Sequence, residues 1–134
     1  MNGLPRRAAA VFLGLHGLIH LMGFAAAWQL ATLSEIAYRS TVLNGALEVG
    51  DAGTRLLGIG WLVVAPAFLV AAYGLWRARP WALRVIGVVA AVSLGICVLG
   101  LPDAYRGVAI DVGILVAVAV VAFVRPARIA GVAR

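Results

Sequence analysis

Four long runs of hydrophobic residues, separated by short polar segments, dominate the sequence. The runs cover about residues 8–31, 53–76, 82–101 and 104–124. A helix needs about 20 predominantly apolar residues to cross the hydrocarbon layer of a membrane, and each run is about that long. The pattern therefore predicts an all-α fold, a polytopic membrane four-helix bundle that forms a single domain over residues 1–134.

The segments between the runs predict how the helices are connected. Residues 32–52 carry scattered polar residues, so we expect the longest loop here, with room for a short interfacial helix. The first run follows Arg6 and Arg7, but it is too long for the apolar core of a signal peptide, so we expect a retained helix. Leu101 and Pro102 end the third run, and Asp103 is a predicted N-cap for the last helix.

Composition agrees with a membrane location. The chain is 64% hydrophobic and 12% charged, whereas soluble domains are about 45–50% apolar and about 25% charged. The net charge of +6 comes from eleven arginines without any lysine. These arginines cluster at the ends of apolar runs rather than along one stripe, so we expect lipid headgroups, not nucleic acid, as their counter-charge.

The arginines also predict an orientation. With four spans, one side of the membrane carries eight of them: Arg6, Arg7, Arg77, Arg79, Arg84, Arg125, Arg128 and Arg134. The other side carries three: Arg39, Arg55 and Arg106. Positively charged loops stay in the cytoplasm. We therefore expect both termini to be cytoplasmic, in a multi-pass protein of a bacterial cell (inner) membrane.

Two histidines in the first run are the first candidates for chemistry. His16 and His20 are four residues apart, which places both imidazoles on one helix face, with His20 near the bilayer midplane. Such a pair can pass a proton, bind a substrate, share a metal ion or bond a neighbouring helix. There is no third histidine. The single cysteine, Cys97, lies in an apolar run, so we expect it to be a small buried hydrophobic residue. We expect no metal and no cofactor.

Asp111 is the third catalytic candidate, beside His16 and His20. It lies eight residues after Asp103, which is about 12 Å along a helix and inside the outer part of the hydrocarbon layer. A carboxylate at that depth is costly and needs a partner. Arg55 and Arg106 are the predicted partners, in either a structural ion pair or a functional acid/base group.

Further polar residues near the same side are candidates for ligand binding. They are Glu48, Asp51, Arg55, Asp103 and Arg106. If the second helix begins near Asn44, the first three lie on one face, as a solvated charged face or as the mouth of a cavity. We expect a polar pocket between the first, second and fourth helices, opening away from the cytoplasm, with the histidines at its bottom. The third helix would then serve mainly as a packing or oligomer surface.

Two segments carry a family resemblance. Residues 16–24, HGLIHLMGF, resemble the N-terminal signature of a family of small bacterial four-helix membrane proteins. Residues 103–107 with Asp111 resemble the C-terminal block of that family, in which Asn is expected at the last position. The first helix is also distantly similar to that of the DoxX-like four-helix membrane proteins. The resemblance implies a four-helix membrane fold over nearly the whole chain and no particular reaction.

Three functions are compatible with these patterns. The first is binding of a lipophilic small molecule, such as a lipid, quinone or terpenoid, with or without acid/base catalysis. The second is a non-enzymatic membrane subunit that scaffolds or regulates a partner complex. The third is a proton- or ion-coupled transport element, which with four helices would need to work as an oligomer, such as a homo-oligomer.

Overall fold

The computed structural model describes residues 3–33 and 36–132, with side chains as far as residue 124. The described residues form four helices: α1 (Gly3–Ala27), α2 (Gly50–Trp76), α3 (Ala82–Leu99) and α4 (Tyr105–Val132). Each is long and apolar enough to cross a membrane. The predicted all-helical fold with four candidate spans is confirmed.

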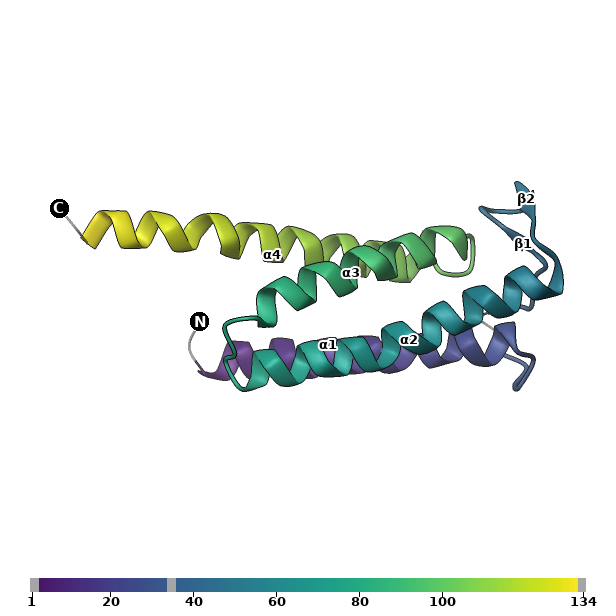
Figure 1. Ribbon diagram of the computed structural model, residues 1–134, viewed down its shortest axis with the longest axis horizontal. Coiled ribbons are helices and arrows are strands. Elements are labelled where there is room, and N and C mark those ends of the chain that lie inside the picture. The colour runs from purple at the N-terminus through teal and green to yellow at the C-terminus, as the bar shows by residue number, and fades with distance from the viewer. Residues whose placement is uncertain (1–2, 34–35, 133–134) are drawn as a thin grey trace.

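The helices lie along one common long axis (Figure 1). Helix α1 packs along α2, α3 packs along α4, and α2 also contacts α3. The start of α1, the α2–α3 turn and the end of α4 lie at one end of the molecule, and the α1–α2 and α3–α4 connections lie at the other (Figure 1).

The helix boundaries differ from the apolar runs. Helix α1 covers Gly3–Ala27 rather than about 8–31, and α2 begins at Gly50 rather than at about 53. Gln29, with φ of 53°, and Gly50, with φ of 64°, adopt left-handed backbone conformations at these two ends. An apolar run shows which residues suit the hydrocarbon layer, whereas the end of a helix is set by backbone turns such as these. The limits of a run and of its helix therefore need not coincide.

The α1–α2 connection contains a hairpin, and its described residues do not include the short interfacial helix for which the sequence leaves room. Strand β1 (Thr41–Val42) pairs antiparallel with β2 (Leu47–Glu48). Its turn is left-handed at Leu43, Asn44 and Gly45, conformations that Asn and Gly adopt readily. The N–H groups of Leu43 and Asn44 donate to carbonyls of residues 99 and 101, so the hairpin is held against the end of α3. Residues 34 and 35 lie outside the described part of the chain.

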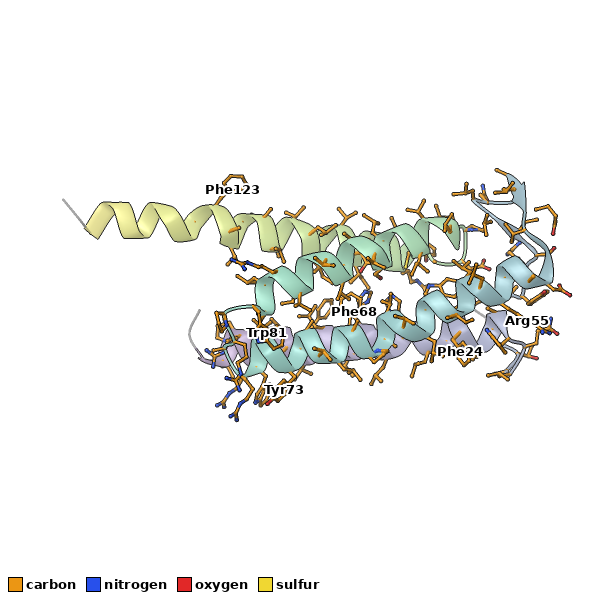
Figure 2. All side chains as sticks on the ribbon, in the orientation of Figure 1. Phe24, Arg55, Phe68, Tyr73, Trp81 and Phe123 are labelled. Carbon is orange, nitrogen blue, oxygen red and sulfur yellow. The ribbon has the colours of Figure 1, made fainter. Side chains whose placement is uncertain are left out.

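Glycines allow α1 and α2 to approach closely. A Cβ atom at Gly17 would lie 2.6 Å from Cβ of Phe68, and one at Gly23 would lie 2.5 Å from the ring of Trp61. Phe68 is fully buried at the centre of the apolar core. Large apolar side chains such as Phe123, 81% exposed, point away from the core (Figure 2). Lipid chains can solvate such an outer surface, as water cannot.

Candidate functional site

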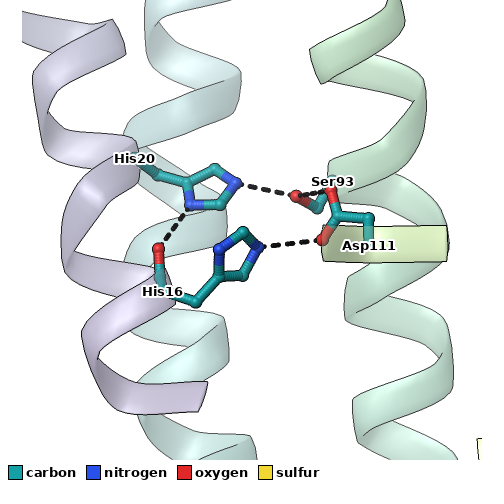
Figure 3. Close-up of polar contacts among 4 residues, drawn as sticks. All are labelled: His16, His20, Ser93 and Asp111. Carbon is teal, nitrogen blue, oxygen red and sulfur yellow. Dashed lines mark hydrogen bonds and ion pairs between the residues drawn. The ribbon is translucent and has the colours of Figure 1, made fainter. Parts of the chain in front are cut away.

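Four buried polar side chains meet between the helix pairs (Figure 3). They are His16 and His20 from α1, Ser93 from α3 and Asp111 from α4, and we call them the buried tetrad. His16 Nε2 lies 2.9 Å from Asp111 Oδ1, and the Ser93 hydroxyl lies 2.6 Å from Asp111 Oδ2. His20 Nε2 lies 2.7 Å from the Ser93 oxygen, and His20 Nδ1 lies 2.9 Å from the His16 carbonyl oxygen. The tetrad links three helices through one network.

Local sequence explains the arrangement on α1. The i, i+4 spacing places the two imidazoles edge to face on the buried face of the helix, with ring centroids 4.8 Å apart. Phe68 of α2 packs against both rings, with centroid distances of 4.9 Å to His16 and 5.5 Å to His20. Gly17 permits this contact because a larger residue there would collide with Phe68. The structure therefore has both imidazoles on one helix face, as the spacing predicts.

The predicted partners of Asp111 are wrong. Its carboxylate contacts His16 and Ser93, and not Arg55 or Arg106. The Arg55 guanidinium instead lies 5.7 Å from the ring of Trp28, near the end of α1. Asp111 is 0% exposed, and a long cationic side chain near a helix end turns toward the membrane interface rather than inward.

The prediction that α3 is mainly a packing surface is also wrong, since Ser93 is the central member of the tetrad. Ser93 is 0% exposed and is flanked in sequence by Val92 and Leu94. The sequence signal that could have pointed to Ser93 is a hydroxyl within an apolar run, because a buried hydroxyl requires a hydrogen-bond partner. Its partners, on α1 and α4, could not be read from the run itself.

The five predicted ligand-binding residues separate into two groups. Glu48 lies on β2, before the helix begins, and accepts a hydrogen bond from the Gly50 N–H at 3.2 Å. Asp51 accepts a hydrogen bond from the Tyr38 hydroxyl. Together with Arg55 they do not form the predicted single face, because α2 starts at Gly50 and not near Asn44. None of the three lines the larger cavity of the described structure.

Asp103 and Arg106, in contrast, do line that cavity. Asp103 is not the N-cap of α4, which begins at Tyr105. Its carboxylate accepts hydrogen bonds from Arg39, at 3.0 Å from Nε and 3.4 Å from Nη2. Hydrogen bonding to Asp103 and the negative charge of its carboxylate raise the pKa of Arg39 above its ordinary value. The ion pair ties the α1–α2 connection to the start of α4.

The larger cavity has a volume of about 490 Å³. It reaches from the tetrad histidines to the α1–α2 and α3–α4 connections, so α3 borders it as well as the three predicted helices. Its walls are mainly apolar, with Ile19, Leu57, Trp61 and Ile110 among them. The charged and phenolic residues at its far end are Tyr38, Arg39, Asp103, Tyr105 and Arg106. One end of the cavity thus carries charge, and the other carries imidazoles.

The other end of the molecule has a smaller cavity of about 360 Å³. Its lining is apolar and comes from all four helices, including Leu13, Leu75, Ile86 and Ile114. Ile110 borders both cavities. The smaller cavity offers space for hydrocarbon but no group for chemistry.

In the structure the tetrad forms a hydrogen-bonded network. The nitrogen and oxygen atoms of His16, His20 and Asp111 lie within 4.8 Å of one another. The same atoms are also already bonded to each other or to Ser93. A bound ion would replace these hydrogen bonds.

No protein-family model, curated protein or solved structure matches this chain. The resemblance of residues 16–24 to small bacterial four-helix membrane proteins therefore stays a prediction.

Proposed function

We propose that this protein is a multi-pass membrane protein that binds a lipophilic small molecule with a polar head group in its larger cavity. The observation that carries the proposal is the cavity of about 490 Å³, with mainly apolar walls, imidazoles at one end and charged groups at the other. Ligand pockets have volumes of about 300–1,000 Å³ and combine apolar walls with a few polar groups that orient the ligand.

The two ends of the cavity have different roles in this proposal. Asp103, Arg106 and Arg39 select molecules that enter, because they are the charged groups at its far end. His16 and His20 lie at the inner end and are hydrogen-bonded to Asp111 directly or through Ser93. Imidazoles coupled to a carboxyl group can give and take protons near neutral pH. Acid/base chemistry on the bound molecule is part of the proposal.

The proposed setting is a bacterial inner membrane, in which the helices form a four-helix bundle with both termini in the cytoplasm. The excess of arginines at the ends of the chain and between α2 and α3 supports this orientation. The cavity would then open on the extracytoplasmic side. A reporter that fluoresces only in the cytoplasm should be bright at the C-terminus and dark when inserted at Gly45, and the reverse result would contradict the orientation.

Ligand binding is tested by native mass spectrometry of the purified protein. We expect the wild-type protein to retain a lipophilic compound and to bind added dodecanol. Ala104→Phe should abolish both, because Ala104 lines the cavity. Ala109→Phe is the matched control, because Ala109 is exposed on α4 and outside that lining.

Two results would count against the proposal. An empty wild-type protein that also fails to bind dodecanol would overturn it, as would equal binding by both alanine variants. An empty protein that copurifies with a stoichiometric membrane partner would favour the scaffolding role instead. Proton flux in liposomes that is lost in His20→Ala would favour the transport role.

A further inference from the structure

The hydrogen bonds of the buried tetrad allow its protons to be counted. Each of the four contacts joins a pair of atoms at 2.6–2.9 Å, and each needs one hydrogen between the pair. Two neutral imidazoles and one hydroxyl supply three hydrogens, and an ionised carboxylate supplies none. The closed network therefore contains one proton more than ionised Asp111 with neutral His16 and His20.

His16 does not carry the additional proton. Its Nδ1 atom is buried and has no hydrogen-bond partner among the described residues. A hydrogen on Nδ1 would be a buried donor without an acceptor. Leaving Nδ1 unprotonated, as a buried acceptor without a donor, costs less free energy. His16 is therefore neutral, with its hydrogen on Nε2, and it donates to Asp111.

The additional proton is confined to the path from Asp111 through Ser93 to His20. His20 Nδ1 must bear a hydrogen, because its partner, the His16 carbonyl, can only accept. In one arrangement Ser93 donates to the ionised carboxylate and a cationic His20 donates to Ser93. In the other, a protonated Asp111 donates to Ser93, and Ser93 donates to neutral His20. The two differ only by a shift of hydrogens across the Ser93 hydroxyl, and both have no net charge.

We propose that the buried tetrad is a binding site for a single exchangeable proton, shared between Asp111 and His20 through Ser93, and that release of this proton opens the His20–Ser93 contact. After release, to a water molecule or buffer base in the cavity that His20 lines, Ser93 still donates to the ionised Asp111. His20 Nε2 and the Ser93 oxygen then present lone pairs to each other at 2.7 Å. Such a contact is repulsive, so α1 loses its bond to α3.

The surroundings of the tetrad leave few other groups to take up this proton. On α2 the nearby cavity-lining and packing residues are Phe68 and Trp61, which do not titrate. Helix α3 adds the thiol of Cys97, and α1 adds only the two histidines. The charged and phenolic groups that border the cavity are at its far end: Tyr38, Arg39, Asp103, Tyr105 and Arg106. Proton binding by the tetrad needs no ligand, so this inference goes beyond the proposed function and can fail separately from it.

The site is tested by nitrogen NMR of isotope-labelled full-length protein, titrated from acid to alkaline pH without added ligand. The chain has two histidines, so each imidazole can be assigned from a single substitution. We expect His16 to keep its hydrogen on Nε2 while the His20–Ser93 contact is intact. The His20 Nε2 signal should change in a one-proton step that coincides with loss of that contact. If the proton is held on Asp111, infrared spectra should show a carboxyl band replaced by a carboxylate band in the same step. If it is held on His20, the carboxylate band should be present throughout and the imidazolium should become a neutral imidazole.

Asp111→Asn is the decisive variant. The Asn amide can accept from His16 and donate to Ser93, which leaves the contact between Ser93 and His20 formed without a titratable carboxyl group. We expect the step in His20 to disappear and the contact to persist at alkaline pH. Asp51→Asn is the matched control, since Asp51 bonds Tyr38 and does not line the cavity, so it should leave the step unchanged.

Ser93→Ala provides a second test if Asp111→Asn fails to fold. It removes the bridge but keeps both titratable groups, so the coupled step should be replaced by a titration of His20 that is independent of Asp111. An unchanged coupled step in either variant would overturn the proposal. So would a wild-type protein in which His20 shows no step while its contact with Ser93 persists at every pH.

Discussion

Gly17 tests whether close packing of α1 and α2 holds the site together. Replacing it with Ala would place a Cβ atom 2.6 Å from Cβ of Phe68 and 3.0 Å from the carbonyl oxygen of Ala65. Neither atom is the free end of a flexible side chain, so the helices themselves must move apart. Overpacking of this kind costs about 1–3 kcal/mol.

The matched control is Gly95→Ala on α3, where an added Cβ atom has no neighbour within 4 Å. Both substitutions gain the helix propensity of Ala over Gly, about 0.8–1 kcal/mol. Because this gain cancels in the comparison, Gly17→Ala should be about 1–3 kcal/mol less stable than Gly95→Ala. Guanidinium unfolding in detergent, followed by circular dichroism, measures the difference.

The substitution should also disturb the tetrad. Phe68 packs on both imidazoles, so a shift of α2 away from α1 changes the ring contacts of His16 and His20. We expect the histidine NMR signals to move in Gly17→Ala and to stay in place in Gly95→Ala. Equal stability of the two variants would refute the packing argument, and unchanged histidine signals in Gly17→Ala would refute the link from packing to site.

Three other results are expected. His16→Ala removes a hydrogen-bond donor to the fully buried Asp111 and should cost about 1–3 kcal/mol of unfolding free energy; an unchanged unfolding free energy would contradict a structural role for this hydrogen bond. The hydrogen bond to Asp51 raises the pKa of Tyr38 above 10.0, so its stabilising effect is complete below pH 10 and is lost as pH rises through the folded value. Asp51→Asn should lower that pKa in a phenolate absorbance titration, and no change would show that Asp51 is not the cause. Cys97, the single cysteine, is buried and should react with a maleimide far more slowly in native than in denatured protein; equal rates would show that α3 is not packed as described.

Much of the fold could be predicted from the sequence because membrane spans are local features. A run of about 20 apolar residues is itself the property that a bilayer selects. The spacing of His16 and His20 likewise places both on one face of any helix. The hairpin at residues 41–48 was not predictable in the same way, since it depends on left-handed turn residues and on backbone bonds to the end of α3.

The partners of the polar residues were decided by the tertiary structure. Arg55 looked like a partner for Asp111 by charge and predicted side of the membrane, but the carboxylate lies with His16, 95 residues away in sequence, and with Ser93. Sequence patterns constrain how deep a residue lies and which helix face it occupies, because both follow from local periodicity. They do not determine which faces meet, since that depends on close approach at Gly17 and on packing around Phe68. The sequence alone therefore identified His16, His20 and Asp111, whereas only the assembled helices added Ser93 and joined the four into one network.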